Sequence, residues 1–371
     1  MGSKSIVEHF GEVPDPREDN SSHQLTDIFA IAICASICGA DGWTDMEEFG
    51  HAKRGWFERF LELPHGIPSH DTFSRVFARI DPQVLNERFS SWCAQLAQPD
   101  EGEVISIDGK TARRSHDGAN GRSALHTVSA WAHDAGLVLG RQAVEEKSNE
   151  ITAIPELLEM LELSGCVVTI DAMGTQTSIA ERIVDADADY VLALKDNHHT
   201  LCQEVGEYFE GMEEQAELPE HIDYAKSVDT DHGRTEIRHC WTTGDIEWLE
   251  SKNAWARLHS ICVIKSERYI GEQKSEQTRY FISSLQPNAH RLAHAVRSHW
   301  AIENSLHWVL DIAFREDECR KRTDHSAENF SILRHLTLNM LKRETTSKRS
   351  IKGKRLRAGW DEAYLEKVIR T

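Results

Sequence analysis

Apolar residues recur at helical spacing through residues 1–98. The segment PSHDTFSRVFARIDP places four apolar side chains at i, i+3, i+4 and i+7: Phe73, Val76, Phe77 and Ile80. Pro82 follows this predicted helix, and a second helix with an apolar face is predicted from 83 to 96. Two helices separated by a short turn are typical of a DNA-reading helix-turn-helix and equally of an ordinary helical pair. The pattern predicts an α-helical N-terminal domain and leaves both roles open.

The pattern changes after the polar linker QPDEGE. Short apolar runs bounded by turn residues predict five strands, at 104–108, 124–132, 137–144, 166–170 and 190–194. Helical spacing between the later strands predicts helices at 151–163 and 176–188. This order of elements predicts a mixed α/β sheet with helices on both of its faces.

A β-rich stretch from about 226 to 286 follows, and then two further helices, at 288–314 and 327–344. The β-rich stretch interrupts the helical pattern and is interpreted as an insertion into the α/β core. We therefore expect three units: a helical domain at 1–98, an α/β core at 99–344 and a basic C-terminal tail at 345–371.

The formal net charge of −19 counts against nucleic-acid binding for the chain as a whole, but the charge is uneven. Residues 204–223 hold eight acids and no Lys or Arg, whereas residues 342–357 hold eight bases and one acid. A basic run can bind phosphates while the rest of a protein stays acidic. We predict that Lys352, Lys354 and Arg355 contact DNA, and a solvated disordered tail is the alternative.

The chain has no apolar run of about 18 residues, so no membrane-spanning helix is expected. Its first residues also lack the apolar segment of a secretory signal. We expect a cytoplasmic protein without a membrane partner.

Two predicted strands end in the same way, VISID at Asp108 and VVTID at Asp171. Ligands and metals collect at the ends of neighbouring strands in an α/β sheet, and Mg²⁺ prefers carboxylate oxygens. Two such ions can clamp the attacking and leaving oxygens of a phosphoryl transfer. Either aspartate alone could be a turn residue, but the repeated signal favours a shared metal site. Gly109 and Gly174 are expected to leave room there for a phosphodiester.

A third acid is available in the helix SHWAIENSLHWVLDIAF. His299, Glu303 and His307 are spaced at i, i+4 and i+8, which places them on one helix face. A carboxylate among the surrounding Trp, Ile and Leu side chains is expensive to bury without a partner, and a metal ion would be such a partner. An ordinary surface glutamate is the alternative.

Three motifs, IDGKT, TIDAMGTQ and HWAIENSLHWVLDIAFRED, together resemble the DDE transposases of bacterial insertion sequences. Within them the chain resembles the As-one branch of the insertion-sequence-four group, which includes the H-repeat-associated proteins. The resemblance covers nearly the whole chain, including DIFAIAICASICGADGWTDMEEF, LALKDNHHTL and DHGRTEIR.

The resemblance implies a ribonuclease-H-like core with a β-rich insertion before the last acid, in agreement with the predicted strand order. It also implies that Asp108, Asp171 and Glu303 are the catalytic, metal-binding triad for two Mg²⁺ ions, which Mn²⁺ can replace. The implied activity is cleavage at the ends of a mobile element and strand transfer into target DNA. Double-stranded DNA, as terminal inverted repeats and target, would be the partner of a homodimer associated with the nucleoid.

The broader group has Tyr, Arg and Lys around its glutamate, whereas this chain has Val296, His299 and Leu310 at those places. His299 could still donate to a DNA phosphate when it is protonated. The other candidate DNA contacts are basic side chains near the acids or in the insertion: Lys110, Lys195, Arg234, Arg238 and Arg297. Each could also be an ordinary surface residue.

Two alternative functions remain open from the sequence. One is a domesticated DNA-binding protein that no longer cleaves, and the other is a metal-dependent nuclease without strand transfer. Asp311 and Glu316 are the acids that could replace Glu303 in the site.

Overall fold

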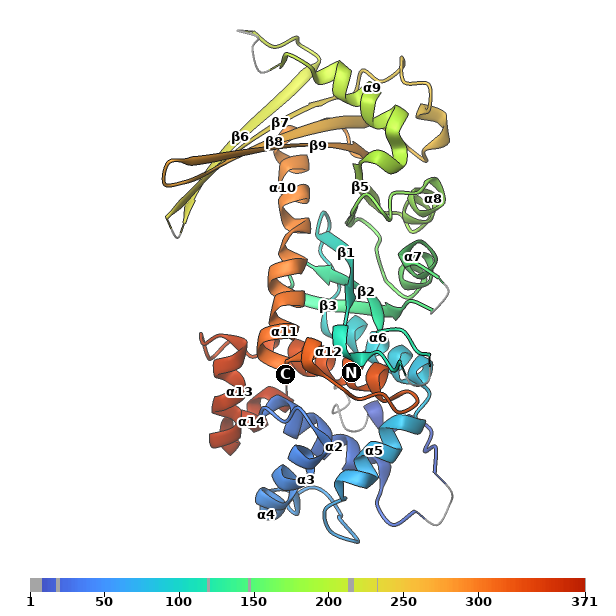
Figure 1. Ribbon diagram of the computed structural model, residues 1–371, viewed down its shortest axis with the longest axis vertical. Coiled ribbons are helices and arrows are strands. Elements are labelled where there is room, and N and C mark those ends of the chain that lie inside the picture. Colours follow the sequence, from blue (N-terminus) through green and yellow to red (C-terminus); the bar gives the residue numbers. More distant parts are fainter. Residues whose placement is uncertain are drawn as a thin grey trace.

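The computed structural model describes residues 9–17, 21–118, 121–145, 148–212, 217–231 and 233–370. One nine-stranded sheet runs through it in the order β3-β2-β1-β4-β5-β9-β8-β7-β6. Figure 1 shows a helical end, the first half of the sheet in the middle, and an arm of long strands at the opposite end.

The first half of the sheet has the order expected of a ribonuclease-H-like core. β1 (Val104–Thr111), β2 (His126–Ala132) and β3 (Leu137–Ala143) are antiparallel neighbours. β4 (Val167–Ile170) and β5 (Asp189–Leu194) run parallel to β1. The predicted fold class, a mixed α/β core with a helical N-terminal region, is therefore confirmed.

Helices cover both faces of this core, because its strands carry apolar side chains on both faces of the sheet. Ile107 and Ile170 pack with α7 (Glu150–Glu159) and α8 (Thr177–Asp185) on one face. Val104 and Val167 pack with α10 (Ala289–His299) on the other.

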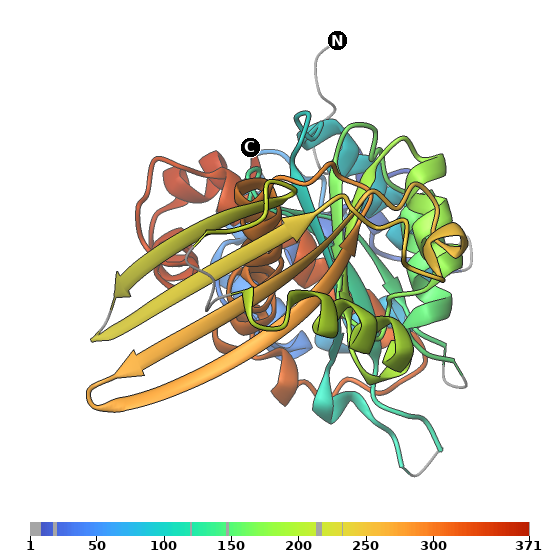
Figure 2. The same cartoon turned by 90° about the horizontal axis from the view of Figure 1, so that it is seen from above.

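The β-rich insertion forms the arm. Its four antiparallel strands are β6 (Ile222–Asp231), β7 (Arg234–Thr243), β8 (Ser260–Ile270) and β9 (Gln273–Ser283). β9 also pairs with β5, so the insertion continues the core sheet. α9 (His199–Phe209) covers one face of the arm, and α10 covers the base of the other. Figure 2 shows the two hairpins extending well beyond these helices.

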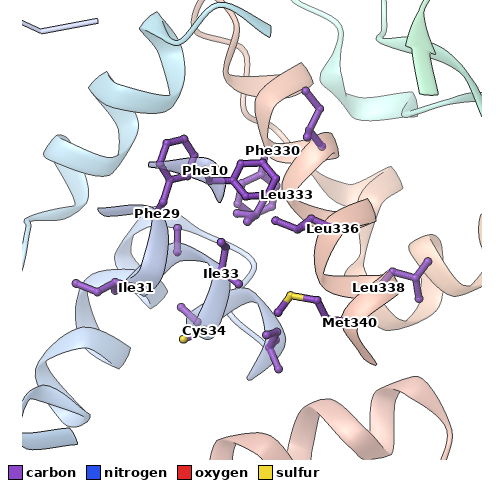
Figure 3. Packing of buried hydrophobic residues seen from close by; sticks show 14 of the residues in the cluster. Phe10, Phe29, Ile31, Ile33, Cys34, Phe330, Leu333, Leu336, Leu338 and Met340 are labelled. Carbon is purple, nitrogen blue, oxygen red and sulfur yellow. The ribbon is translucent and has the colours of Figure 1, made fainter. Parts of the chain in front are cut away.

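The helical end contains the N-terminal helices and the last three helices of the chain. The first group is α2 (Leu25–Ile37), α3 (Trp43–Ala52), α4 (Arg54–Phe57), α5 (His70–Arg79) and α6 (Pro82–Leu96). The second is α12 (Ser326–Arg343), α13 (Ile351–Trp360) and α14 (Glu362–Ile369). Both groups share one hydrophobic core, in which residues of α2 face residues of α12 (Figure 3). Within the described ranges, no helix is both long and apolar enough to span a bilayer.

The predicted helical pair is present as α5 and α6, with Ser69 capping α5 and Asp81 capping α6. α6 packs against both β3 and α12. A recognition helix needs a free face that can enter a DNA groove, so this packing favours the ordinary helical pair.

The basic C-terminal segment is folded, contrary to the prediction of a tail, because α13 and α14 contribute apolar side chains to the shared core. Lys354 is buried and donates to the carbonyl oxygens of Leu341 (2.7 Å) and Glu344 at the end of α12. Arg355 is buried and donates to the carbonyl oxygens of Ser36 (2.9 Å) and Ala313. Cations at helix C-termini satisfy carbonyls that lack a partner. Neither side chain is free to contact DNA in this structure, whereas Lys352 is exposed.

Candidate active site

The three predicted acids, Asp108, Asp171 and Glu303, line one cavity of about 470 Å³. The register of the sheet explains why the two aspartates meet. Ile107 of β1 is paired with Ile170 of β4 in a parallel ladder. The residues that follow them, Asp108 and Asp171, therefore lie close together. The cavity opens at this edge of the sheet, where parallel strands of an α/β sheet present their carboxyl ends.

Each aspartate is oriented by a backbone amide and is close to a glycine. Asp108 Oδ1 accepts from Gly109 N at 2.9 Å, and Asp171 Oδ1 accepts from Gly174 N at 3.1 Å. The sequence predicts that the two glycines leave open space for a phosphodiester, and this prediction is wrong. A Cβ on Gly174 would lie 2.4 Å from Ile170 Cγ2, and a Cβ on Gly109 would lie 2.0 Å from an oxygen of Glu150. Protein side chains already fill that space.

The site carries negative charge that its protein neighbours do not neutralise. Burial, together with the charges of Asp171, Glu150 and Glu303, raises the pKa of Asp108 to about 7. Burial and the charge of Glu150 also raise the pKa of Asp171, although Lys195 opposes this. Like charges disfavour ionisation of a carboxyl group, and a cation reverses that effect.

The donor set is chemically suited to a divalent cation. Carboxylate oxygens from separate segments are the ligands that Mg²⁺ and Mn²⁺ prefer. Among the described residues, no three His, Cys, Asp or Glu side chains are already gathered closely enough to hold an ion. The three acids share a cavity but do not form a finished coordination shell.

Glu303 begins a π-helical turn, Glu303–His307, between α10 and α11 (Trp308–Phe314). Such turns insert a residue into a helix and occur frequently at functional sites. Here Ile302 and Leu306 are buried in the core while Glu303 is exposed to the cavity. His307, which the sequence placed beside Glu303, lies with Nδ1 3.5 Å from Asp108 Oδ2.

The acids that could have replaced Glu303 belong to a separate ion-pair cluster. Lys110 Nζ lies 2.7 Å from Asp311 Oδ1, 3.3 Å from Glu316 Oε2 and 3.3 Å from Asp317 Oδ1. Glu316 is buried, and Arg334 and Lys110 hold its pKa down to about 2 against the effect of burial. Lys110 is therefore occupied by protein carboxylates, contrary to its predicted contact with phosphate.

His299 also differs from the prediction of a charged phosphate donor. Its Nδ1 lies 3.1 Å from Thr169 Oγ1, and burial lowers its pKa to about 4. It therefore stays neutral at physiological pH. Lys195, in contrast, is exposed at the end of β5 and lines the cavity beside Asp171, as predicted for a residue at a strand end.

Arg238 of the arm and Arg297 of α10 meet at one carboxylate. Both guanidinium groups donate to Asp229 Oδ2, Arg238 at 2.8 Å. Arg234 is exposed farther out on β7. The sequence reading missed Arg279 of β9, whose guanidinium lies 4.0 Å above the ring of Trp300. Arg279 lines both the cavity and a smaller hollow that holds Arg238 and Arg297. Its only sequence signal is its position two residues before the buried Phe281 in a strand.

Known protein families and relatives match the sequence of this chain over most or all of its length. The family model described as "Transposase DDE domain" matches residues 99–340, and the one described as "DDE_Tnp_1-associated" matches residues 7–93. The H repeat-associated putative transposase YhhI of Escherichia coli K12 is 40% identical, covering 100% of this chain and 98% of that protein. The putative transposase YncI of Escherichia coli O157:H7 is 38% identical, covering 100% and 95%.

A piggyBac transposase in a synaptic complex with hairpin DNA aligns at 10% identity with a TM-score of 0.44, covering 98% of this chain and 78% of that chain. That likeness is too weak to support a conclusion. The matched family models and the full-length relatives show by themselves to which family the chain belongs. The chain belongs to the DDE transposase family and is a DNA transposase.

Proposed function

We propose that Asp108, Asp171 and Glu303 are the catalytic residues and hold two Mg²⁺ ions, which Mn²⁺ can replace. The observation that supports this most strongly is their convergence on one cavity from three separate segments, with negative charge that the protein leaves unbalanced. When bound, the ions would supply the charge stabilisation that phosphoryl transfer requires. The reactions are cleavage at the element ends and joining of the freed 3′ ends to target DNA.

The chain's own residues have mainly a positioning role in this proposal. The amides of Gly109 and Gly174 hold the two aspartates in place, and the π turn presents Glu303 to the same space. Most of a phosphoryl transfer can be catalysed by such positioning and by charge neutralisation.

The proposed partner is double-stranded DNA, as terminal inverted repeats and target, bound in the nucleoid by a homodimer that pairs two ends. Lys195 and Arg279 line the cavity, Arg238 and Arg297 line the adjoining hollow with Arg279, and Arg234 lies farther out at the end of the β6–β7 hairpin. Arg75 and Arg79 add a basic edge on the outer side of α5, beside His23. These groups support backbone contacts, which position DNA without reading its sequence.

The test is a strand-transfer assay on the inverted repeats that flank the gene, with Asp108→Asn, Asp171→Asn and Glu303→Gln. Each variant should lose cleavage and joining, whereas Glu318→Gln, an exposed acid paired with Arg315, should remain active. The triad is misassigned if any of the three variants keeps wild-type activity.

The same assay separates the alternative functions. Site-specific binding without metal-dependent nicking would indicate a domesticated DNA-binding protein. Nicking, combined with failure to join pre-cleaved ends that carry a free 3′-OH, would indicate a nuclease without strand transfer.

A further inference from the structure

An exposed apolar patch lies where α11 and α13 meet. Trp308 and Ile312 are one turn apart on α11, and Leu356 and Trp360 are one turn apart on α13. Residues at this spacing share a helix face. The two tryptophans, at 59% and 73%, are the most exposed large apolar side chains that the structure describes, and Ile312 and Leu356 are exposed beside them. We call these four residues the tryptophan patch.

The contact between the two helices places the exposed pairs side by side. α11 and α13 pack against each other (Figure 1). Arg355 of α13 donates to the carbonyl oxygen of Ala313, and its guanidinium lies 4.2 Å from the ring centroid of Phe314. Ile312 and Leu356 are adjacent in sequence to residues of this contact, so the two exposed pairs flank it.

The tryptophan patch is large enough to form the centre of a stable interface. A tryptophan presents up to about 250 Å² and Ile or Leu somewhat less, so the four side chains together expose roughly 500 Å². A stable protein interface buries about 800 Å² on each partner, with an apolar centre in which tryptophan is enriched. The patch would therefore supply more than half of the area that each partner needs.

The patch lies beside the proposed catalytic glutamate. α11 directly follows the π turn that begins at Glu303, so Trp308 lies roughly 7 Å from Glu303 along the helix axis. A partner that covers the patch is therefore close to the cavity of the three acids. Two chains joined at this surface would hold their cavities near each other, as the pairing of two DNA ends requires.

The charges around the patch fit a second copy of the chain. Lys352 is exposed one turn before Leu356, and Arg357 lies 3.8 Å from Asp361 at the end of α13. A twofold interface applies the same surface to both partners, so the basic groups of one copy can meet the partner's Asp361. Duplex DNA fits less well, because its phosphates attract basic side chains and the centre of the patch is apolar.

We propose that the tryptophan patch is the interface of a homodimer, in which two copies of the chain pair α11 and α13 across a twofold axis. The inference rests on the proposed function, because it identifies the surface that forms the homodimer proposed there. It adds that the two chains associate before DNA is bound, since the burial of apolar surface does not depend on DNA.

The test is analytical ultracentrifugation of the full chain at micromolar concentrations without DNA. The wild type should sediment as a dimer. Ile312→Glu should raise the dissociation constant of the dimer by roughly a hundredfold, because the charge enters the interface twice. Ile270→Glu is the matched control, since Ile270 at the end of β8 has the same exposure as Ile312, 51%, and it should dimerise as the wild type does. A monomeric wild type, or an Ile312→Glu dimer as stable as that of the wild type, would overturn the inference.

A second variant tests the patch without adding a charge. Trp360→Ala should weaken the dimer by roughly tenfold or more, as the loss of a tryptophan at the centre of an interface typically does. Its melting temperature at concentrations where the wild type is monomeric should equal that of the wild type, because the side chain is already exposed. Unchanged dimer affinity in Trp360→Ala would contradict the inference.

Asp171→Asn separates this inference from the proposed function. The variant should form dimers as the wild type does and should fail to cleave DNA. If it cleaves, the triad is misassigned and the interface stands. If the wild type is monomeric while Asp171→Asn is inactive, the interface is wrong and the triad stands.

Discussion

Two groups of acids are built around neighbouring positions of β1, Asp108 and Lys110, and their most buried carboxyl groups, those of Asp108 and Glu316, have pKa values shifted in opposite directions. One group, the triad cluster, is Asp108, Asp171 and Glu303, and the other, the Lys110 cluster, is Lys110 with Asp311, Glu316 and Asp317. The pKa of Asp108 is raised to about 7, whereas that of Glu316 is lowered to about 2.

The difference comes from what surrounds each cluster. Lys110 and Arg334 neutralise the buried acid of the Lys110 cluster, so that charge belongs to the folded structure. In the triad cluster the neighbours whose charges act on Asp108 are other acids, and Lys195 is exposed at the margin. Acids that belong to one sequence motif can therefore differ in role, and the difference is whether the protein itself supplies a positive charge beside them.

The largest expected effect is on stability in the Lys110 cluster. Glu316→Gln should lower the free energy of unfolding at pH 7 by about 3–5 kcal/mol, because it removes the carboxylate that is paired with the buried Arg334. The folded pKa of about 2 lies below the ordinary 4.5, so this contribution is present above 4.5 and disappears as pH falls toward 2. Urea unfolding across this range measures it, with Glu318→Gln as the exposed control. Equal stability of wild type and Glu316→Gln at pH 7 would break the comparison.

The next effect is a gain in stability from added cation. At a concentration of one hundred times the dissociation constant, Mg²⁺ or Mn²⁺ should stabilise the wild type by about 2.7 kcal/mol. Asp171→Asn should lose this gain, while Asp317→Asn should keep it. Thermal melting with and without metal measures both, and a gain that survives in Asp171→Asn would place the ion elsewhere.

A smaller effect on stability, that of Asp108→Asn, has the opposite sign to the effect of Glu316→Gln. The folded pKa of Asp108, about 7, lies above the ordinary 3.8, so the wild type loses stability as pH rises from 3.8 through 7. Metal-free Asp108→Asn should therefore be more stable than the wild type at pH 8, by about 1–3 kcal/mol. The difference should vanish near pH 4. Thermal melting in EDTA tests this, and a destabilised variant at pH 8 would contradict it.

The smallest effect distinguishes the two lysines. Lys195→Met should lower the slope of log affinity against log salt for DNA by about one, as loss of one phosphate contact does. Lys110→Met should leave that slope unchanged and reduce stability instead. Fluorescence anisotropy at several salt concentrations measures the slopes, and an unchanged slope for Lys195→Met would remove it from the DNA surface.

Local patterns in the sequence were sufficient to predict that Asp108 and Asp171 lie close together. Each follows a short apolar run, and the parallel register of β1 and β4 then brings them together, although β1 continues past Asp108 to Thr111. Glu303 needed the family resemblance, because its helix pattern gave no sign of the π turn that separates it from the buried face. The five core strands and their order along the chain were likewise predictable from period and turn residues.

Other features depend on tertiary contacts that a local pattern does not contain. Lys354 and Arg355 belong to a basic run, yet Lys354 caps a carbonyl of the preceding helix and Arg355 caps one of a helix 319 positions away. Lys110 follows the first acid, yet it pairs with acids more than 200 positions later.

Iron-directed cleavage of the protein tests the central contrast most directly. Fe²⁺ in place of Mg²⁺, with ascorbate and peroxide, cuts backbone near the bound ion, and mass spectrometry locates the cuts. Cleavage should occur near residues 108, 171 and 303, should be suppressed by excess Mg²⁺, and should be absent from 311–317. Cuts concentrated at 311–317, or cuts that Asp171→Asn leaves unchanged, would contradict the assignment of the unbalanced acids as the cation site.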